Sequence, residues 1–176
     1  MTDELAFHLA DQLDHHWRRQ LRPRLDGLTD DEYFWAPVPD CWTLHTDGSI
    51  DYEFPEPDPA PLTTISWRPA HITVGVLAVR GHGYFGGPPA DYRTWPYAPD
   101  ADTALQQLDS AYRVWIEGVQ RLDDRQLRRP LGPAEGPYAD RLMVDLVLHI
   151  HREVIHHGAE IALLRDLFAH TQPEES

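Results

Sequence analysis

Residues 142–168, LMVDLVLHIHREVIHHGAEIALLRDLF, decide the fold. The stretch contains no proline, and apolar residues recur in it every three or four positions, which is typical of an amphipathic helix. On a helical wheel with about 100° between successive residues, the apolar stripe is centred close to His157. Glu153 lies one turn earlier and only about 40° away, so both side chains are predicted to face inward. The same projection predicts that His151 points largely outward.

An inward Glu153 and His157 have two interpretations. Burying an ionised carboxylate is costly unless it is paired or bound to a cation, and a Glu/His pair one turn apart can hold a divalent metal. Alternatively, the two side chains only hydrogen-bond to each other, or to an arginine, inside the core. This helix alone leaves both interpretations open.

The composition argues against several classes of partner. The chain has 176 residues, a formal charge of −14 and no lysine, and this acidic excess argues against nucleic acid and anionic membranes. A single cysteine, Cys41, excludes an internal disulfide and a cysteine-rich zinc site. No signal-like N-terminus or long apolar run is present, so we expect a soluble, cytoplasmic protein forming one domain over residues 1–176.

The rest of the chain predicts three further long helices, at residues 3–22, 66–84 and 101–122. Thr29 begins a short capped helical turn, since Glu32 follows it three residues later. Residues 41–54 alternate around a glycine turn and predict a small β-hairpin, which a proline-rich linker follows. The most economical fold class is all-α: a four-helix bundle with a β-hairpin insertion between the first and second long helices.

His71, on the second predicted helix, shares a face with the small residues Gly75 and Ala78. Small residues there let another element approach closely or leave a cavity. A bundle brings His71 towards Glu153 and His157 on the fourth helix. Three protein ligands with one open position is the arrangement that catalytic zinc sites use.

The motifs WRPAHI at residues 67–72 and REVIHHGAE at residues 152–160 resemble those of the DinB-like superfamily of metal-binding four-helix bundles. Many members of that superfamily place three histidines on the metal. Here Glu153 stands at the middle ligand position, which is similar to the mycothiol-dependent maleylpyruvate isomerase branch and its histidine, glutamate, histidine set. The resemblance therefore implies a metal site formed by His71, Glu153 and His157.

The resemblance also implies a chemistry. We expect a divalent metal, zinc by ligand type with Ni²⁺, Fe²⁺ or Mn²⁺ as alternatives, that lowers the pKa of a low-molecular-weight thiol such as mycothiol. The expected activity is a thiol-dependent transferase or isomerase acting on an electrophilic small molecule. His149, His156 and Glu160 are predicted as catalytic residues that either orient the metal ligands or carry protons.

Other readings stay open or fail on the sequence. Glu153 and His156 match the ExxH motif of di-iron bundles, but such a site needs a second motif and the chain has none. A non-catalytic metal-binding or stress-response module and a metal-hydroxide hydrolase both stay possible. A homodimer is predicted because Trp17, Trp35 and Trp115 exceed what one small bundle must bury.

Overall fold

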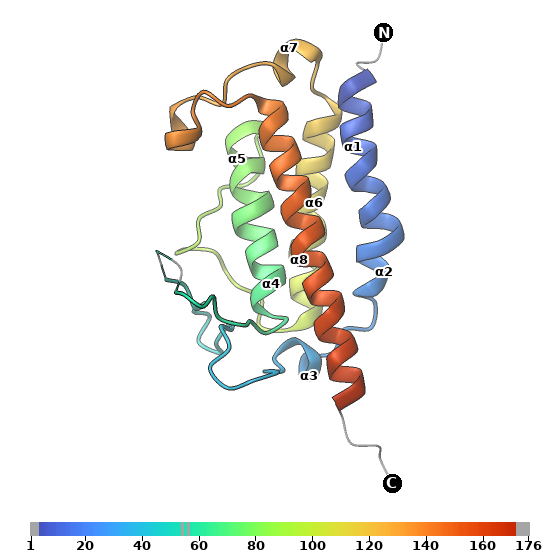
Figure 1. Cartoon of the computed structure of the whole chain (residues 1–176), viewed down its shortest axis with the longest axis vertical. Helices are drawn as coiled ribbons and strands as arrows, with labels where there is room; N and C mark the ends of the chain where they lie inside the picture. The colour runs from blue at the N-terminus through green and yellow to red at the C-terminus, as the bar shows by residue number, and fades with distance from the viewer. Residues whose placement is uncertain (1–3, 54, 56, 172–176) are drawn as a thin grey trace.

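The computed structural model describes residues 4–53, 55 and 57–171, which form four long helical segments packed side by side (Figure 1). The segments are α1 (Glu4–His16) continued by η1 (Trp17–Leu21) and α2 (Arg22–Arg24); α4 (Trp67–His71) continued by η2 (Ile72–Ala78) and α5 (Val79–Phe85); α6 (Ala101–Gln120); and α8 (Met143–Thr171). The predicted long helices are thus confirmed, although the predicted start at residue 3 lies outside the described residues. None of the described helices combines the length and apolar character needed to cross a membrane.

Local signals set the ends of these segments. Asp100 caps α6 by accepting a hydrogen bond from the Thr103 amide, and the Asp145 carboxylate accepts one from Leu142 N at the start of α8. The second segment ends at Gly86, whose φ of 72° is the left-handed conformation that glycine adopts most easily.

α8 packs on two sides. It contacts α4 and η2 of the second segment and also α1 and η1 of the first, while α6 contacts the same two segments. The interior is filled by large apolar side chains, among them the fully buried Trp115 of α6, Ile150 and Ile161 of α8 and Leu13 of α1. The two sides of α8 therefore bury a wider arc than one amphipathic stripe would.

This wide arc overturns the prediction for His151. Its side chain is only 6% exposed, so it does not point outward, and burial lowers its pKa to about 4. One face of α8 near it meets the first segment, where Gly158 approaches Leu21 so closely that a β-carbon would lie 2.8 Å from the leucine side chain. The helical-wheel projection took the stripe around His157 as the only buried face, whereas α8 also buries the face that contacts the first segment.

Residues 41–53 do not form the predicted β-hairpin, and residue 54 lies outside the described residues. The chain turns back on itself, but a single isolated bridge joins Leu44 to Ile50. Beyond this bridge, Thr43 N donates to the Asp51 carboxylate, and the Asp51 carbonyl accepts a hydrogen bond from Nε1 of Trp67. The hairpin prediction is wrong because these contacts stop the ladder after one bridge, and the part of the chain that the structure describes contains no strand.

Three short elements complete the fold: α3 (Asp30–Tyr33), α7 (Asp124–Leu127) and η3 (Pro133–Tyr138). The capped turn predicted at Thr29 is confirmed as the start of α3, since Thr29 and Glu32 exchange side-chain to backbone hydrogen bonds. The sequence analysis missed α7 and η3. The signal for α7 was present in Asp123 and Gln126, which form the same reciprocal cap.

The tryptophans behind the homodimer prediction are mostly accommodated within the chain. Trp115 is fully buried, Trp17 stacks on Tyr112 with ring centroids 3.9 Å apart, and Trp35 is half-buried against Phe168. The exposed apolar side chains include Leu148, Ile155, Leu163 and Leu167 of α8. The homodimer itself stays a prediction.

Arg165 joins the C-terminal half of α8 to the turn before α3. Its guanidinium forms two hydrogen bonds of 3.0 Å to the carboxylate of Glu32, a residue that is 7% exposed. It also donates to the backbone carbonyls of Arg24 and Asp26. Loss of this one side chain would leave a buried carboxylate and two carbonyls without their partner.

We expect Arg165→Leu to destabilise the chain by about 2–4 kcal/mol, because it breaks a largely buried charge pair. Arg18→Leu is the matched control and should cost less than about 1 kcal/mol, since Arg18 pairs with Asp14 at the surface. Urea unfolding followed by circular dichroism measures both values. Equal losses in the two variants would show that Arg165 does not hold α8 in place.

Candidate metal centre

His71 is the last residue of α4, directly before the π-helical turn of η2. Its ring stacks on that of Trp67, with centroids 5.0 Å apart and planes 10° apart. Burial lowers the pKa of His71 to about 3, and the neighbouring His157 and Arg68 add to the effect. The imidazole is therefore neutral at physiological pH, which is the form that binds a metal.

The structure brings His71 against His157 across the contact between α4 and α8, and His157 lies beside Glu153 within α8. The rings of His71 and His157 lie with centroids 4.8 Å apart and nearly perpendicular planes. Within α8, Nε2 of His157 lies 3.5 Å from Oε2 of Glu153. His157 is 8% exposed, and a quarter of the Glu153 side chain is exposed.

Glu160 determines which nitrogen of His157 carries the proton. Its Oε2 lies 2.7 Å from Nδ1 of His157, and hydrogen bonding to His157 with the charge of Arg68 outweighs burial and lowers the pKa of Glu160. An ionised carboxylate can only accept, so Nδ1 of His157 is the donor. Arg68 also lies 3.2 Å from that nitrogen, but its guanidinium pairs with Glu160 at the same distance, and a protonated Nδ1 cannot accept from it.

This arrangement leaves two acceptors facing each other. In the neutral ring, Nε2 of His157 has a lone pair and no proton, and it faces the Glu153 carboxylate. A cation between the two atoms satisfies both. A metal or a second proton on His157 can take that place, so metal binding is expected to release protons.

Tyr92 holds His71 from the opposite side. Its hydroxyl lies 2.7 Å from Nδ1 of His71, and burial raises the pKa of the phenol so that it keeps its proton. The end of the Tyr92 side chain lies directly against Gly75, where an added β-carbon would be 1.8 Å from the Tyr92 oxygen. Gly75, the small residue beside His71, therefore leaves room for a tyrosine from the connecting loop. The sequence analysis did not identify Tyr92 or Arg68 as residues that hold the histidines.

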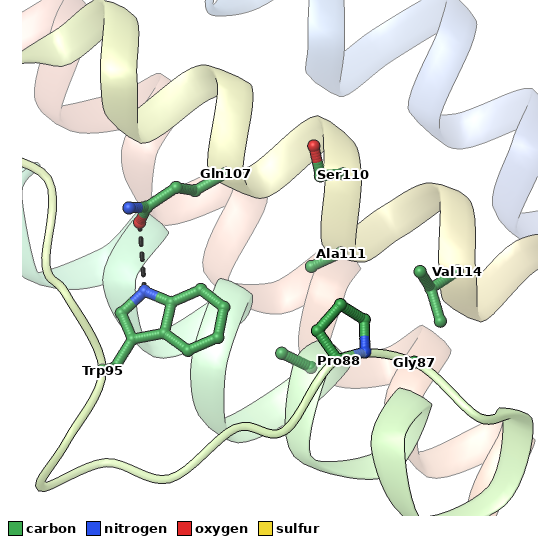
Figure 2. Close-up of a pocket in the computed structure, with 8 residues that line it drawn as sticks. Gly87, Pro88, Trp95, Gln107, Ser110, Ala111 and Val114 are labelled. Carbon is green, nitrogen blue, oxygen red and sulfur yellow. Dashed lines mark hydrogen bonds between the residues drawn. The ribbon is translucent and has the colours of Figure 1, made fainter.

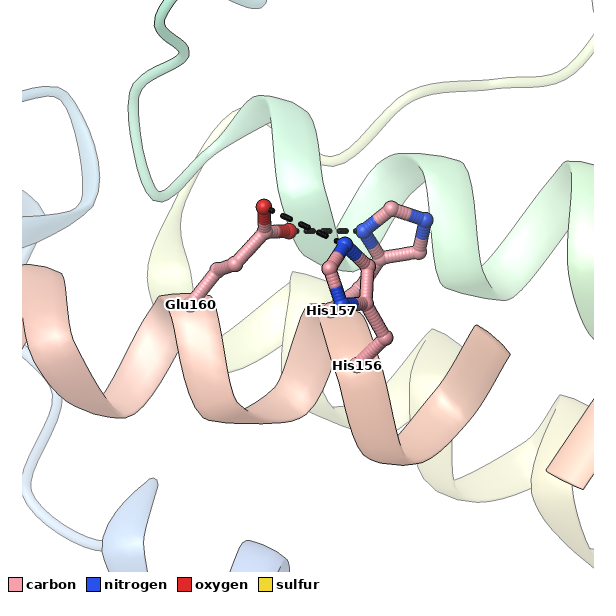
Figure 3. Close-up of side chains that lie close together, drawn as sticks. All are labelled: His156, His157 and Glu160. Carbon is pink, nitrogen blue, oxygen red and sulfur yellow. Dashed lines mark hydrogen bonds and ion pairs between the residues drawn. The ribbon is translucent and has the colours of Figure 1, made fainter. Parts of the chain in front are cut away.

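A second, overlapping group of possible ligands lies on α8 alone. Ligand atoms of His156, His157 and Glu160 lie within 4.8 Å of one another, and the side chains converge in Figure 3. In this group Glu160 already accepts a hydrogen bond from His157, and two thirds of the His156 side chain is exposed. Among the described residues, this is the group whose ligand atoms all lie within that distance. In the group predicted from the sequence, Nε2 of His157 faces Glu153, and the His157 ring lies 4.8 Å from that of His71.

The three residues predicted as catalytic all lie beside a member of this centre. Glu160 bonds to His157, the ring centroid of His156 lies 5.0 Å from that of His157, and Nδ1 of His149 lies 3.4 Å from Oε1 of Glu153. His149 and His156 are exposed, whereas Glu160 is two-thirds buried. Glu160 is thus placed to orient a metal ligand, and the two histidines are placed to exchange protons with solvent.

Two cavities differ in what they offer to a ligand. The cavity in Figure 2, of about 160 Å³, lies between the loop at Gly87, Pro88 and Trp95 and one side of α6, and no titratable side chain lines it. A larger cleft of about 560 Å³ borders α8 at His149 and Arg152. Only the larger cleft reaches residues that contact Glu153.

Comparison with known proteins identifies one family. A family model described as the DinB superfamily matches residues 12–161, which include all the residues of the candidate centre. No curated protein and no solved structure gives a significant match to the chain.

Single substitutions distinguish the two possible ligand groups. We expect His71→Ala and Glu153→Gln each to weaken zinc binding by more than about 100-fold, the upper range for residues that only support a ligand. His156→Ala should change the affinity less than about threefold, since its ring lies outside the group predicted from the sequence. Competition with a chromogenic chelator measures each affinity. Loss of zinc in His156→Ala with retention in His71→Ala would assign the metal to His156, His157 and Glu160.

The contact between Gly75 and Tyr92 predicts a second, coupled effect. Tyr92→Phe removes the hydrogen bond to His71, and Gly75→Ala displaces the hydroxyl that makes it, so each should weaken zinc binding about 10-fold or more. The double variant should be no weaker than the worse single variant, because both remove the same interaction. Gly83→Ala is the control, since open space surrounds that glycine. Fully additive losses would show that Gly75 acts on the site by another route.

Proposed function

The chain belongs to the DinB superfamily, and from that premise we propose that it is a metal-dependent enzyme that activates a low-molecular-weight thiol for transfer or isomerisation. His71, Glu153 and His157 would hold a divalent metal. The observation that carries the proposal is the Glu153 carboxylate facing Nε2 of His157, whose Nδ1 bonds to Glu160, with the neutral ring of His71 against that of His157.

The donor set fits a borderline divalent ion such as zinc, because it combines two imidazole nitrogens with one carboxylate. A metal bound there would lower the pKa of a thiol that reaches it. Glu153 contributes the single negative charge among the three donors. The donors thus neutralise half the charge of a divalent ion, and the remaining charge favours an anionic ligand such as a thiolate.

The nucleophile is proposed to come from a small molecule because the chain has no suitable thiol of its own. Cys41 is the only cysteine, and its thiol lies 3.2 Å from the Val38 carbonyl in the segment before α4. A cosubstrate such as mycothiol would supply the sulfur, and an electrophilic small molecule would accept it. His149, exposed and 3.4 Å from Glu153, is placed to take up the proton that the thiol loses.

Arg68 and Tyr92 serve this proposal by fixing the ligands. Arg68 holds Glu160 against His157, and Tyr92 holds His71, so both rings are fixed through Nδ1 with Nε2 left for the metal. Fixed ligands keep the open position in one place, which a reaction between two small molecules requires.

We expect cobalt-substituted protein to develop a thiolate-to-metal charge-transfer absorption when mycothiol, bacillithiol or glutathione is added. Glu153→His should retain the metal, and the apparent pKa of thiol binding should fall by about one unit or more, because the site loses a negative charge. The pH dependence of any ester hydrolysis should shift towards lower pH for the same reason. Spectral titration against pH measures both effects, with His156→Ala as the control.

The alternatives predict different outcomes of this experiment. A protein that hydrolyses esters or amides and binds no thiol would be a metal-dependent hydrolase. Tight metal binding without thiol binding or hydrolysis would indicate a non-catalytic metal-binding module.

A further inference from the structure

The cleft of about 560 Å³ lies where the connection before α8 packs against α5 and the first turns of α8. This volume falls within the range of about 300–1,000 Å³ that small-molecule sites occupy. Its walls carry three arginines, Arg80, Arg141 and Arg152, against two carboxylates, Glu135 and Asp145. Its cations outnumber its anions, although the chain as a whole carries a formal charge of −14.

The two carboxylates are already engaged. Glu135 pairs with Arg80 at 3.2 Å and also accepts a hydrogen bond from the Tyr84 hydroxyl. Asp145 accepts a hydrogen bond from the Leu142 amide at the start of α8. The pair of Glu135 and Arg80 is neutral, so the ligand-binding capacity of the cleft lies with the other two arginines.

Arg141 and Arg152 both line the cleft, and both are exposed. Arg152 contacts His149 and Glu153, which uses only part of its five donors. Among the described residues, no carboxylate forms an ion pair with Arg141. A guanidinium binds a carboxylate through two parallel hydrogen bonds, which gives orientation as well as affinity.

The cleft adjoins the candidate metal centre through two of its own residues. His149 and Arg152 line it, and both contact Oε1 of Glu153 at 3.4 and 3.6 Å. The other oxygen of Glu153 faces His157.

We propose that this cleft binds a carboxylate-bearing small molecule, with Arg141 and Arg152 as its binding residues. The assignment of that molecule as a substrate rests on the proposed function, whereas the binding itself does not. The carboxylate is fixed by the two arginines, and the reactive end lies beside Glu153.

Succinate and its uncharged diamide, succinamide, are the probes, titrated calorimetrically into the zinc-loaded full-length chain at constant ionic strength. Succinate should bind wild type at least tenfold more tightly than succinamide. The double variant Arg141→Gln/Arg152→Gln should lose at least tenfold in succinate affinity. Arg113→Gln/Arg125→Gln is the matched control, because it removes the same charge from exposed arginines outside the cleft and should stay within twofold of wild type.

The variant His157→Ala separates this proposal from binding at the metal. Succinate affinity should persist in it within about threefold, because the arginines remain. Absence of succinate binding to wild type, equal binding of succinamide, or an unchanged affinity in the cleft double variant would each overturn the proposal. Loss of succinate binding in His157→Ala alone would overturn it too, since the carboxylate would then be a metal ligand.

Zinc content and thiol binding, measured on the same samples, report on the proposed function separately. A chain that binds succinate through the two arginines but binds no thiol keeps the cleft assignment and loses the transferase assignment. A chain that binds a thiol but does not bind succinate through the two arginines would contradict the cleft assignment and support the metal chemistry.

Discussion

The fold depends on the need to satisfy the polar groups that lie between α4 and α8. A neutral imidazole on α4 and a carboxylate and an imidazole on α8 occupy an interface that would otherwise be filled by apolar side chains. Arg68 and Glu160 satisfy one side of His157, and Tyr92 satisfies one side of His71. Nε2 of His157 and the Glu153 carboxylate then face each other, and we propose that a metal is held there.

Periodicity predicted the helices because an apolar stripe is a property of neighbouring residues. It placed Glu153 and His157 correctly on the side of α8 that faces α4, and the small residue at Gly75 correctly indicated a close approach. It failed at His151, because a helix packed against two neighbours buries residues outside its main stripe. The hairpin failed for a different reason, since the Asp51 carboxylate and the Trp67 indole take up the Thr43 amide and the Asp51 carbonyl that would continue the ladder.

What the sequence could not predict are the contacts between distant segments. Tyr92 lies 21 positions from His71, in a loop whose composition gives no sign of its target. Arg68 was visible within the WRPAHI motif, but its partner Glu160 is on another helix. The cleft has the same origin, because Arg141 and Arg152 become neighbours only when the connection before α8 folds against it.

The passage of Tyr92 over Gly75 has a consequence for the history of the family. A β-carbon at position 75 and a tyrosine hydroxyl on His71 occupy the same space, so position 75 cannot gain a side chain while Tyr92 keeps this contact. Relatives that carry a larger residue at the position of Gly75 are expected to lack the tyrosine, and relatives that keep the tyrosine are expected to keep the glycine. Correlated variation at these two positions would mark the lineages that hold their histidine in this way.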